Sequence, residues 1–164
     1  NAGTKEGEIS DILVKVHYLD LSDMQIKEIA KRDLGFEYRN SIFQKHTNKI
    51  VLKALFNLGK GNPEQIKAKM EETKKSRWGK QPREYPNCGS VFKRPEGRFV
   101  GPMIDELGLK GFSIGGAQIS EKHSGFIVNT GGASGKDILN LIKKVQDRVK
   151  EKLGIELDIE QRVI

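Results

Sequence analysis

Apolar and polar residues alternate with a period of two in two stretches of the first third of the chain. The apolar positions are Ile12, Val14, Val16 and Tyr18 in residues 11–19, and Ile50, Leu52, Ala54, Phe56 and Leu58 in residues 50–58. This period is typical of strands with one buried face. Between them, Ser22 with Gln25 three positions later predicts the start of a helix that ends at Gly35. Residues 1 to about 59 are therefore predicted to form a strand, a helix and a strand.

A helical period replaces the alternation after the glycine-containing stretch at residues 59–62. Asn62 is a suitable cap for a helix that begins at Pro63, where a missing N–H costs nothing, and that runs to about Trp78. Gly101 and Pro102 predict a short helix that ends at Gly108. Residues 112–119 and 126–129 are predicted to be short strands.

The longest predicted helix begins at a capping pair, Ser134 with Asp137, and ends at Gly154. Its apolar stripe contains Ile138, Ile142, Val145, Val149 and Leu153. Residues 155–160 alternate again and predict a final strand. Helices and strands are thus mixed without regular strand–helix alternation, which predicts an α+β fold rather than a doubly wound sheet.

Two glycine pairs, at residues 115–116 and 131–132, lack the spacing of a dinucleotide-binding fingerprint or a P-loop. They are interpreted as turns or as places where two backbone segments approach closely. The three histidines and the single cysteine show no metal-ligand spacing, so no metal is predicted. Cys88 and His123 lack a recognised nucleophile signature, and a buried, inert thiol is favoured for Cys88.

At 164 residues with 36% hydrophobic residues, the chain suits one ordinary domain or two small ones. No stretch approaches the roughly 18 apolar residues needed to span a bilayer, so a soluble protein without a membrane partner is predicted. A lone cysteine allows no internal disulfide and is compatible with a cytoplasmic location.

The net charge of +7 suggests an anionic partner. The densest basic segment, residues 60–83, contains Lys60, Lys67, Lys69, Lys74, Lys75, Arg77, Lys80 and Arg83 against Glu64, Glu71 and Glu72. A solvated helix face is favoured over a nucleic-acid surface, because Trp78 is the only aromatic residue in this segment and stacking residues are not interleaved with the charges.

Several short motifs, in order along the whole chain, carry a resemblance to a known family. They are NAG at residues 1–3, YRNSIF at 38–43, CGSVFKRP at 88–95, GLKG at 108–111, IGGAQ at 114–118, SEKHSGFIVN at 120–129 and EQR at 160–162. Together they resemble the UDP-N-acetylenolpyruvoylglucosamine reductase (MurB) family. The resemblance implies that residues 1–60 are the C-terminal part of an FAD-binding domain and residues 61–164 a substrate-binding domain.

The resemblance implies a flavin-dependent reductase of peptidoglycan precursor synthesis, with NADPH as reductant. Hydride from reduced FAD adds to the methylene carbon of UDP-N-acetylglucosamine enolpyruvate, and a proton then quenches the carbanion to give UDP-N-acetylmuramate. In the family, most of the FAD site precedes a motif like residues 1–3, so an N-terminal FAD-binding half is an expected partner. Alone, the chain is expected to bind FAD poorly and to be nearly inactive.

The resemblance also implies roles for individual residues. Ser90 matches the family's proton donor, Arg39 its Tyr-Arg arginine and Glu160 the glutamate of its terminal motif. A guanidinium can stabilise the enolate-like charge, and a protonated carboxyl can donate to the same group. The expected substrate-binding residues are Tyr38, Lys93, Arg94, Gln118, Lys122 and His123, and the expected cofactor-binding residues are Asn1, Ala2 and Gly3.

Without the family, each of these residues has an ordinary explanation. Ser90 would be a turn residue, and Arg39 and Glu160 would be surface charges. His123 remains open between substrate binding and a structural hydrogen bond, and Tyr38 between the site and the core. The alternative function is a non-catalytic basic module that binds a UDP-sugar or nucleic acid, of which nucleic acid is the less expected partner.

Overall fold

The computed structural model describes residues 1–4 and 6–163, and its contacts divide the chain into two compact units, Asn1–Asn62 and Pro63–Ile164. Both units mix helices with antiparallel strands, so the predicted α+β class is confirmed. No helix within the described residues is long and apolar enough to cross a membrane. The assignment of the two units to a flavin-binding and a substrate-binding domain stays a prediction.

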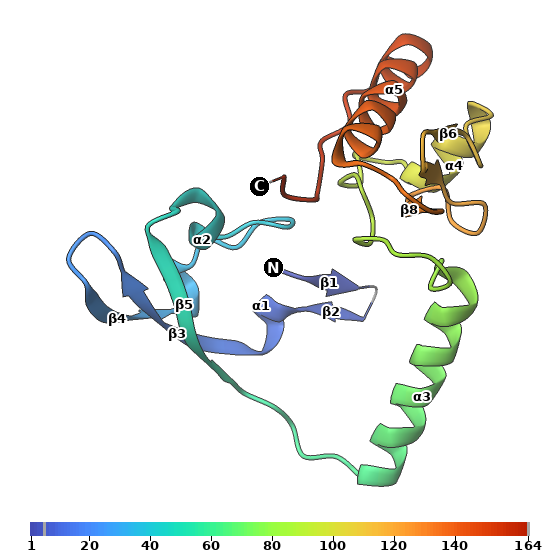
Figure 1. The fold of residues 1–164 in the computed structure, drawn as a ribbon. Helices are drawn as coiled ribbons and strands as arrows, with labels where there is room; N and C mark the ends of the chain where they lie inside the picture. The colour runs from blue at the N-terminus through green and yellow to red at the C-terminus, as the bar shows by residue number, and fades with distance from the viewer. Residues whose placement is uncertain (5, 164) are drawn as a thin grey trace. The chain divides into compact units, whose positions relative to one another are not determined.

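The first unit is built on a three-stranded antiparallel sheet with the strand order β4-β3-β5 (Figure 1). Its elements are β1 (Gly3–Thr4), β2 (Gly7–Glu8), α1 (Ile9–Ile12), β3 (Leu13–Asp20), β4 (Gln25–Ala30), the 3-10 helix η1 (Lys31–Asp33), α2 (Ile42–Lys45) and β5 (Lys49–Phe56). Both neighbours pair with the central strand β3 along most of its length. The predicted strands at residues 11–19 and 50–58 are therefore present, with slightly different ends.

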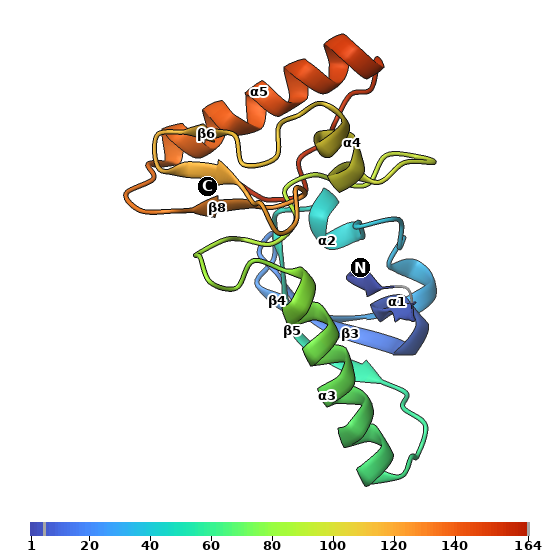
Figure 2. The same cartoon turned by 90° about the vertical axis from the view of Figure 1, so that its right-hand side faces the viewer.

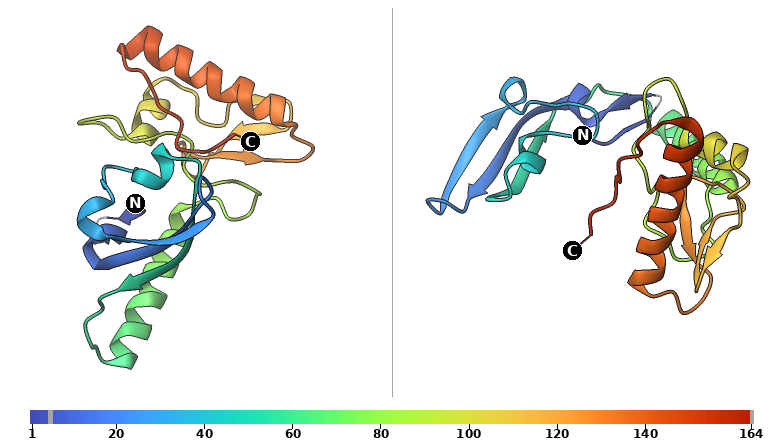
Figure 3. Two further views of the ribbon diagram at one scale, coloured as in Figure 1. Left: turned by 90° about the vertical axis from the view of Figure 1, so that its left-hand side faces the viewer. Right: turned by 90° about the horizontal axis from the view of Figure 1, so that it is seen from above.

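The core of this unit is small. Leu13, Val16 and Leu34 are buried, and the partly buried side chains against them are Ile29, Phe36, Ile42, Phe43 and Ala54. The curved sheet and the short helix α2 beside it are visible in Figure 3. Many apolar side chains of the sheet nevertheless remain exposed, among them Ile26 on β4 and Ile50, Val51, Leu52, Leu55 and Phe56 on β5.

The helix predicted between Ser22 and Gly35 is wrong. Residues 25–30 form strand β4, which pairs with β3 from Gln25 opposite Asp20 to Ala30 opposite Lys15. The Ser22 side chain caps no helix and instead accepts a hydrogen bond from Asn48. Cross-strand pairing and burial therefore override the local capping signal, as tertiary contacts commonly override propensity.

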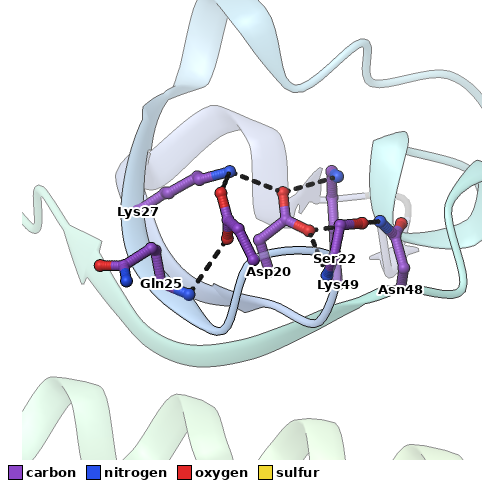
Figure 4. Close-up of polar contacts among 7 residues, drawn as sticks. Asp20, Ser22, Gln25, Lys27, Asn48 and Lys49 are labelled. Carbon is purple, nitrogen blue, oxygen red and sulfur yellow. Dashed lines mark hydrogen bonds and ion pairs between the residues drawn. The ribbon is translucent and has the colours of Figure 1, made fainter.

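A buried carboxylate ties the three strands together at one end of the sheet (Figure 4). Asp20, at the end of β3, accepts hydrogen bonds from Lys27 on β4 at 3.0 Å and from Lys49 on β5 at 3.4 Å. It also accepts from the Ser22 backbone N–H and from the Asn48 amide. The hydrogen bond from Lys27, followed by that from the Ser22 backbone, lowers the pKa of Asp20 far below its ordinary value.

The second unit packs a long helix against a small antiparallel sheet with the order β6-β7-β8 (Figure 2). Its elements are α3 (Pro63–Lys80), α4 (Val100–Glu106), β6 (Ser113–Ile114), β7 (Ala117–Ile119), β8 (Ile127–Asn129) and α5 (Gly135–Leu153). The sheet, α4 and α5 enclose one core, whose fully buried members include Met103, Ile104, Ile119, Leu141 and Val145. None of the residues of α3, all of which are described, is buried.

Helix α5 follows its local sequence signals closely. The Ser134 hydroxyl accepts from the Asp137 N–H, and the Asp137 carboxylate accepts from the Ser134 N–H, as the capping pair predicts. Gly154 ends the helix in the left-handed conformation, with φ of 69°. The predicted stripe faces the core, with Ile142, Val145 and Val149 buried.

Two other predictions for this unit need correction. Residues 112–119 form a hairpin of β6 and β7 rather than one strand. Residues 155–160 form no strand ladder, and only an isolated bridge joins Ile159 to Phe92. Leu157 is buried as the alternation predicts, so the periodic pattern identified a buried side chain and not a regular strand.

The two glycine pairs meet, and a close backbone approach is confirmed. A Cβ atom added at Gly116 would lie 2.3 Å from the Gly131 carbonyl oxygen and 2.5 Å from the Ala133 nitrogen. Gly115 adopts a left-handed φ of 54° at the β6–β7 turn. The tight contact of this turn with residues 131–133 explains why a side chain is excluded at residue 116.

Gly116→Ala is therefore expected to destabilise the second unit by about 1–3 kcal/mol through overpacking. Gly135→Ala is the matched control, since an added Cβ there meets nothing within 4 Å and the residue opens α5. It should be neutral or stabilise by up to about 1 kcal/mol. Urea unfolding followed by helix circular dichroism measures both, and equal stabilities of the two variants would contradict the packing argument.

Asp20→Asn is expected to destabilise the first unit at pH 7, because it removes the charge that Lys27 and Lys49 share. Since the pKa of Asp20 is lowered in the folded state, its stabilisation is complete above the unfolded pKa of about 4 and is lost as the pH falls further. The deficit of the variant should thus shrink below about pH 4. Amide exchange of β3 measures it, with exposed Asp33→Asn as the control.

Candidate functional site

The predicted residues of the first unit lie together. The Arg39 guanidinium donates to the backbone oxygens of Gly3 at 3.2 Å and Asn1 at 3.5 Å, across 36 and 38 residues of sequence. It also lies 4.9 Å from the centre of the Tyr38 ring. The structure therefore joins residues 1–3, expected to bind cofactor, to the Tyr-Arg pair expected at the substrate.

The local backbone explains this arrangement. Arg39 has a left-handed φ of 54°, which is uncommon for a residue other than glycine and reverses the chain within a turn closed by Glu37 and Asn40. The Asn1 side-chain amide donates to Glu8 and to the Glu37 backbone, which fixes the start of the β1–β2 hairpin. Tyr38 is 47% exposed and is not a core tyrosine.

In the second unit, the segment that carries Ser90 lies beside the segment that carries Glu160. The Glu160 N–H donates to the Val91 carbonyl at 2.8 Å, and the Lys93 N–H donates to the Asp158 carbonyl at 2.8 Å. Val91 in turn donates to the Gly125 carbonyl at 3.0 Å, and Ser90 bridges to Phe126. The segment that carries Ser90 and Lys93 is thus paired through its backbone with the segment that carries Glu160, which is distant in the sequence.

The loop before β8 is fixed by its own polar side chains. The buried Ser120 hydroxyl accepts from the backbone N–H groups of Lys122 and His123. The His123 Nδ1 atom accepts from the Gly125 N–H at 3.1 Å, and its ring meets the Phe126 ring edge-on at 4.9 Å. His123 therefore makes the structural hydrogen bond that the sequence left open. This bond holds Gly125, and the next residue, Phe126, forms an isolated β-bridge with Ser90.

Gln118 and Lys122 line an open cavity of about 460 Å³. The other lining residues are Glu84, Tyr85, Ser120, Glu121 and Val128. Lys122 Nζ donates to the Trp78 carbonyl at 3.1 Å and to Glu84 at 3.5 Å, and Gln118 donates to the Gly111 carbonyl. The cavity therefore mixes carboxylates with an ammonium group and is suited to a polar ligand.

Arg94 is exposed, and its guanidinium stacks on the Phe99 ring at 3.8 Å from the ring centre. Trp78 has Arg83 at 3.8 Å and Lys74 at 4.6 Å from its own ring centre. Cations thus occupy the neighbourhood of the one aromatic ring in the basic segment. This arrangement does not favour stacking of nucleic-acid bases on Trp78.

Cys88 is exposed, so the prediction of a buried thiol is wrong. It precedes a turn in which Gly89 has φ of 83°. Two residues that the sequence reading did not select, Asn87 and Gln161, make side-chain hydrogen bonds to this turn. An asparagine two residues before a glycine is a signal for such a turn, whereas Gln161 occupies the unspecified middle position of the Glu-x-Arg motif.

The comparisons with known proteins identify the class of protein. The family model for the UDP-N-acetylenolpyruvoylglucosamine reductase C-terminal domain matches residues 81–164. The chain therefore belongs to this family, as the motifs predict.

Relatives with the name UDP-N-acetylenolpyruvoylglucosamine reductase match nearly the whole chain. The protein of Fervidobacterium nodosum is 52% identical over 161 residues, which are 98% of this chain and 52% of the relative. That of Latilactobacillus sakei is 49% identical over 164 residues, 100% and 54% respectively. The crystal structure of MurB from Thermus caldophilus matches with a TM-score of 0.84 and 37% identity over 99% of this chain and 57% of that one. The chain thus spans about half the length of these relatives.

His123→Ala is expected to accelerate hydrogen exchange of the Gly125 amide several-fold, because it removes a hydrogen bond worth on the order of 1 kcal/mol. Lys122→Ala is the control, since that side chain is directed to Trp78 and Glu84. Exchange measured by NMR on this chain distinguishes them. Unchanged Gly125 exchange in His123→Ala would contradict the structural role.

Proposed function

We propose that the chain is the C-terminal part of a flavin-dependent reductase that converts UDP-N-acetylglucosamine enolpyruvate to UDP-N-acetylmuramate in peptidoglycan precursor synthesis. The observation that carries this proposal is the adjacency of the Ser90 and Glu160 segments within the unit that the family model matches. The reaction needs a proton donor and a group that stabilises enolate charge near the same carbon. A hydroxyl and a carboxyl on adjacent segments can meet both needs.

Ser90 gives its proton to the carbanion of the substrate. Its hydroxyl is a weak acid, yet it can protonate a strongly basic carbon when it is held within hydrogen-bond reach. Arg39 donates hydrogen bonds to the carboxylate that gains charge, and Glu160 acts on the same enolate. The substrate's anionic and polar groups are bound by Tyr38, Lys93, Arg94, Gln118 and Lys122. His123 holds the loop that carries Lys122.

Bound FAD supplies the hydride, and NADPH serves as the reductant. Asn1, Ala2 and Gly3 form this chain's part of the flavin site. Their role is supported by the hydrogen bonds that Arg39 donates to the Asn1 and Gly3 carbonyls, which hold these residues beside the Tyr-Arg pair. An N-terminal FAD-binding half, which the family motifs imply, is the proposed partner that supplies most of the cofactor site. We propose a cytoplasmic location for this reaction.

The decisive variant is Ser90→Ala in a full-length reductase that joins this chain to a flavin-binding half. Flavin reduction by NADPH should be unchanged, since it does not involve Ser90. Reoxidation of the flavin by the enolpyruvyl substrate should slow by about 100- to 10,000-fold, the usual contribution of a positioned acid. Stopped-flow absorbance of the flavin follows both half-reactions.

Ser113→Ala is the control for this experiment, because the Ser113 hydroxyl is exposed and donates only locally, to the Gly111 carbonyl. It should reoxidise at the normal rate. Normal reoxidation in Ser90→Ala as well would exclude Ser90 as the proton donor.

A further inference from the structure

The turn that presents Ser90 is held by the side-chain amide of Asn87. The Asn87 Oδ1 atom accepts from the Gly89 N–H at 3.0 Å. Its Nδ2 atom donates to the carbonyls of Pro82 at 2.7 Å and Tyr85 at 2.9 Å. Both donor hydrogens and the acceptor of one amide are thus used to fix the turn against the preceding segment.

Gln161 holds the same turn from a distant part of the chain. Its Nε2 atom donates to the Gly89 carbonyl at 3.2 Å, across 72 residues of sequence. The preceding residue, Glu160, donates its backbone N–H to the Val91 carbonyl. Residues 160 and 161 therefore contact the chain directly before and directly after Ser90.

These contacts determine how the serine is presented. Gly89 has φ of 83°, a backbone conformation that only glycine adopts readily. The orientation of its N–H and carbonyl groups is therefore set by their hydrogen bonds. The Gly89 carbonyl and the Ser90 nitrogen belong to one planar peptide group. Gln161 fixes that carbonyl, Asn87 fixes the Gly89 N–H, and backbone pairing fixes Val91, so the backbone on both sides of Ser90 sets the direction of its Cα–Cβ bond.

We infer that Asn87 and Gln161 are positioning residues for the Ser90 hydroxyl: they act through the Gly89 turn and do not touch the substrate. The inference deepens the proposed function and rests on proton donation by Ser90. A donor must lie within hydrogen-bond reach of the carbon, and a displacement of about 1 Å costs roughly 100-fold in rate. Holding the turn by two side-chain amides limits such displacement.

The variants Gln161→Met and Asn87→Ala test this inference. Methionine keeps the length of glutamine but donates no hydrogen bond. Gln146→Met is the matched control, since Gln146 Nε2 donates to the Leu157 carbonyl at 2.8 Å and so makes the same kind of bond in the same unit. Both glutamine variants then lose a hydrogen bond from the side-chain amide to a backbone carbonyl. They differ only in which carbonyl loses its donor, that of Gly89 or that of Leu157.

In the full-length reductase, Gln161→Met and Asn87→Ala should slow flavin reoxidation by the enolpyruvyl substrate by roughly 10- to 100-fold. Flavin reduction by NADPH should be unchanged in both. Gln146→Met should reoxidise at the normal rate. If Gln161→Met behaves like Gln146→Met while Ser90→Ala is slow, the positioning role is overturned and the proposed function stands.

A double-mutant cycle shows whether Gln161 acts through Ser90. In the Ser90→Ala background, Gln161→Met should cause no further loss, because the hydroxyl that it positions is gone. An additive loss would overturn the inference, since Gln161 would then act by another route. If Ser90→Ala itself reoxidises normally, proton donation by Ser90 and the positioning role both fail.

A measurement on this chain alone is independent of turnover. The HN–Hα coupling of Ser90 reports its backbone φ, and it should become averaged in Gln161→Met and Asn87→Ala but not in Gln146→Met. Protected Val145 and Val149 amides confirm that the core remains folded. An unchanged Ser90 coupling in both positioning variants would overturn the inference whatever the rates.

Discussion

Backbone pairing at Val91 is the constraint on which the candidate site of the second unit depends. Val91 donates to Gly125 and accepts from Glu160, so three segments far apart in the sequence are fixed at one residue. Its side chain is almost fully buried in the core of the unit. The exposed Ser90, the proposed proton donor, therefore directly precedes a well-anchored neighbour, and it is solvent-accessible while Val91 is not.

The sequence predicted elements well where the signal is local. Ser134, Asp137 and Gly154 identify both ends of α5, because a capping pair and a left-handed glycine act within one turn of helix. The helix prediction for residues 22–35 failed because their structure depends on partners elsewhere in the chain. Strand β4 is held by pairing with β3 and by Asp20, which accepts hydrogen bonds from lysines on two strands. Long-range pairing leaves no local mark of comparable strength.

The same distinction applies to the site. Motif order selected Arg39, Ser90 and Glu160, and the structure places the last two on adjacent segments. Motif order could not select Gln161, because a side-chain amide that donates to a carbonyl 72 residues away follows no local rule. The predicted burial of Cys88 was also wrong. The preference of cysteine for interiors is an average over proteins, and Cys88 lies on an exposed turn.

That exposed thiol has a practical consequence. Because the sequence contains a single cysteine, a maleimide fluorophore or nitroxide would attach at one place without any engineered substitution. The label would lie two positions from Ser90, on the far side of Gly89, outside the buried core. Its emission or its spectral line shape would follow local motion of this turn in real time during ligand titrations.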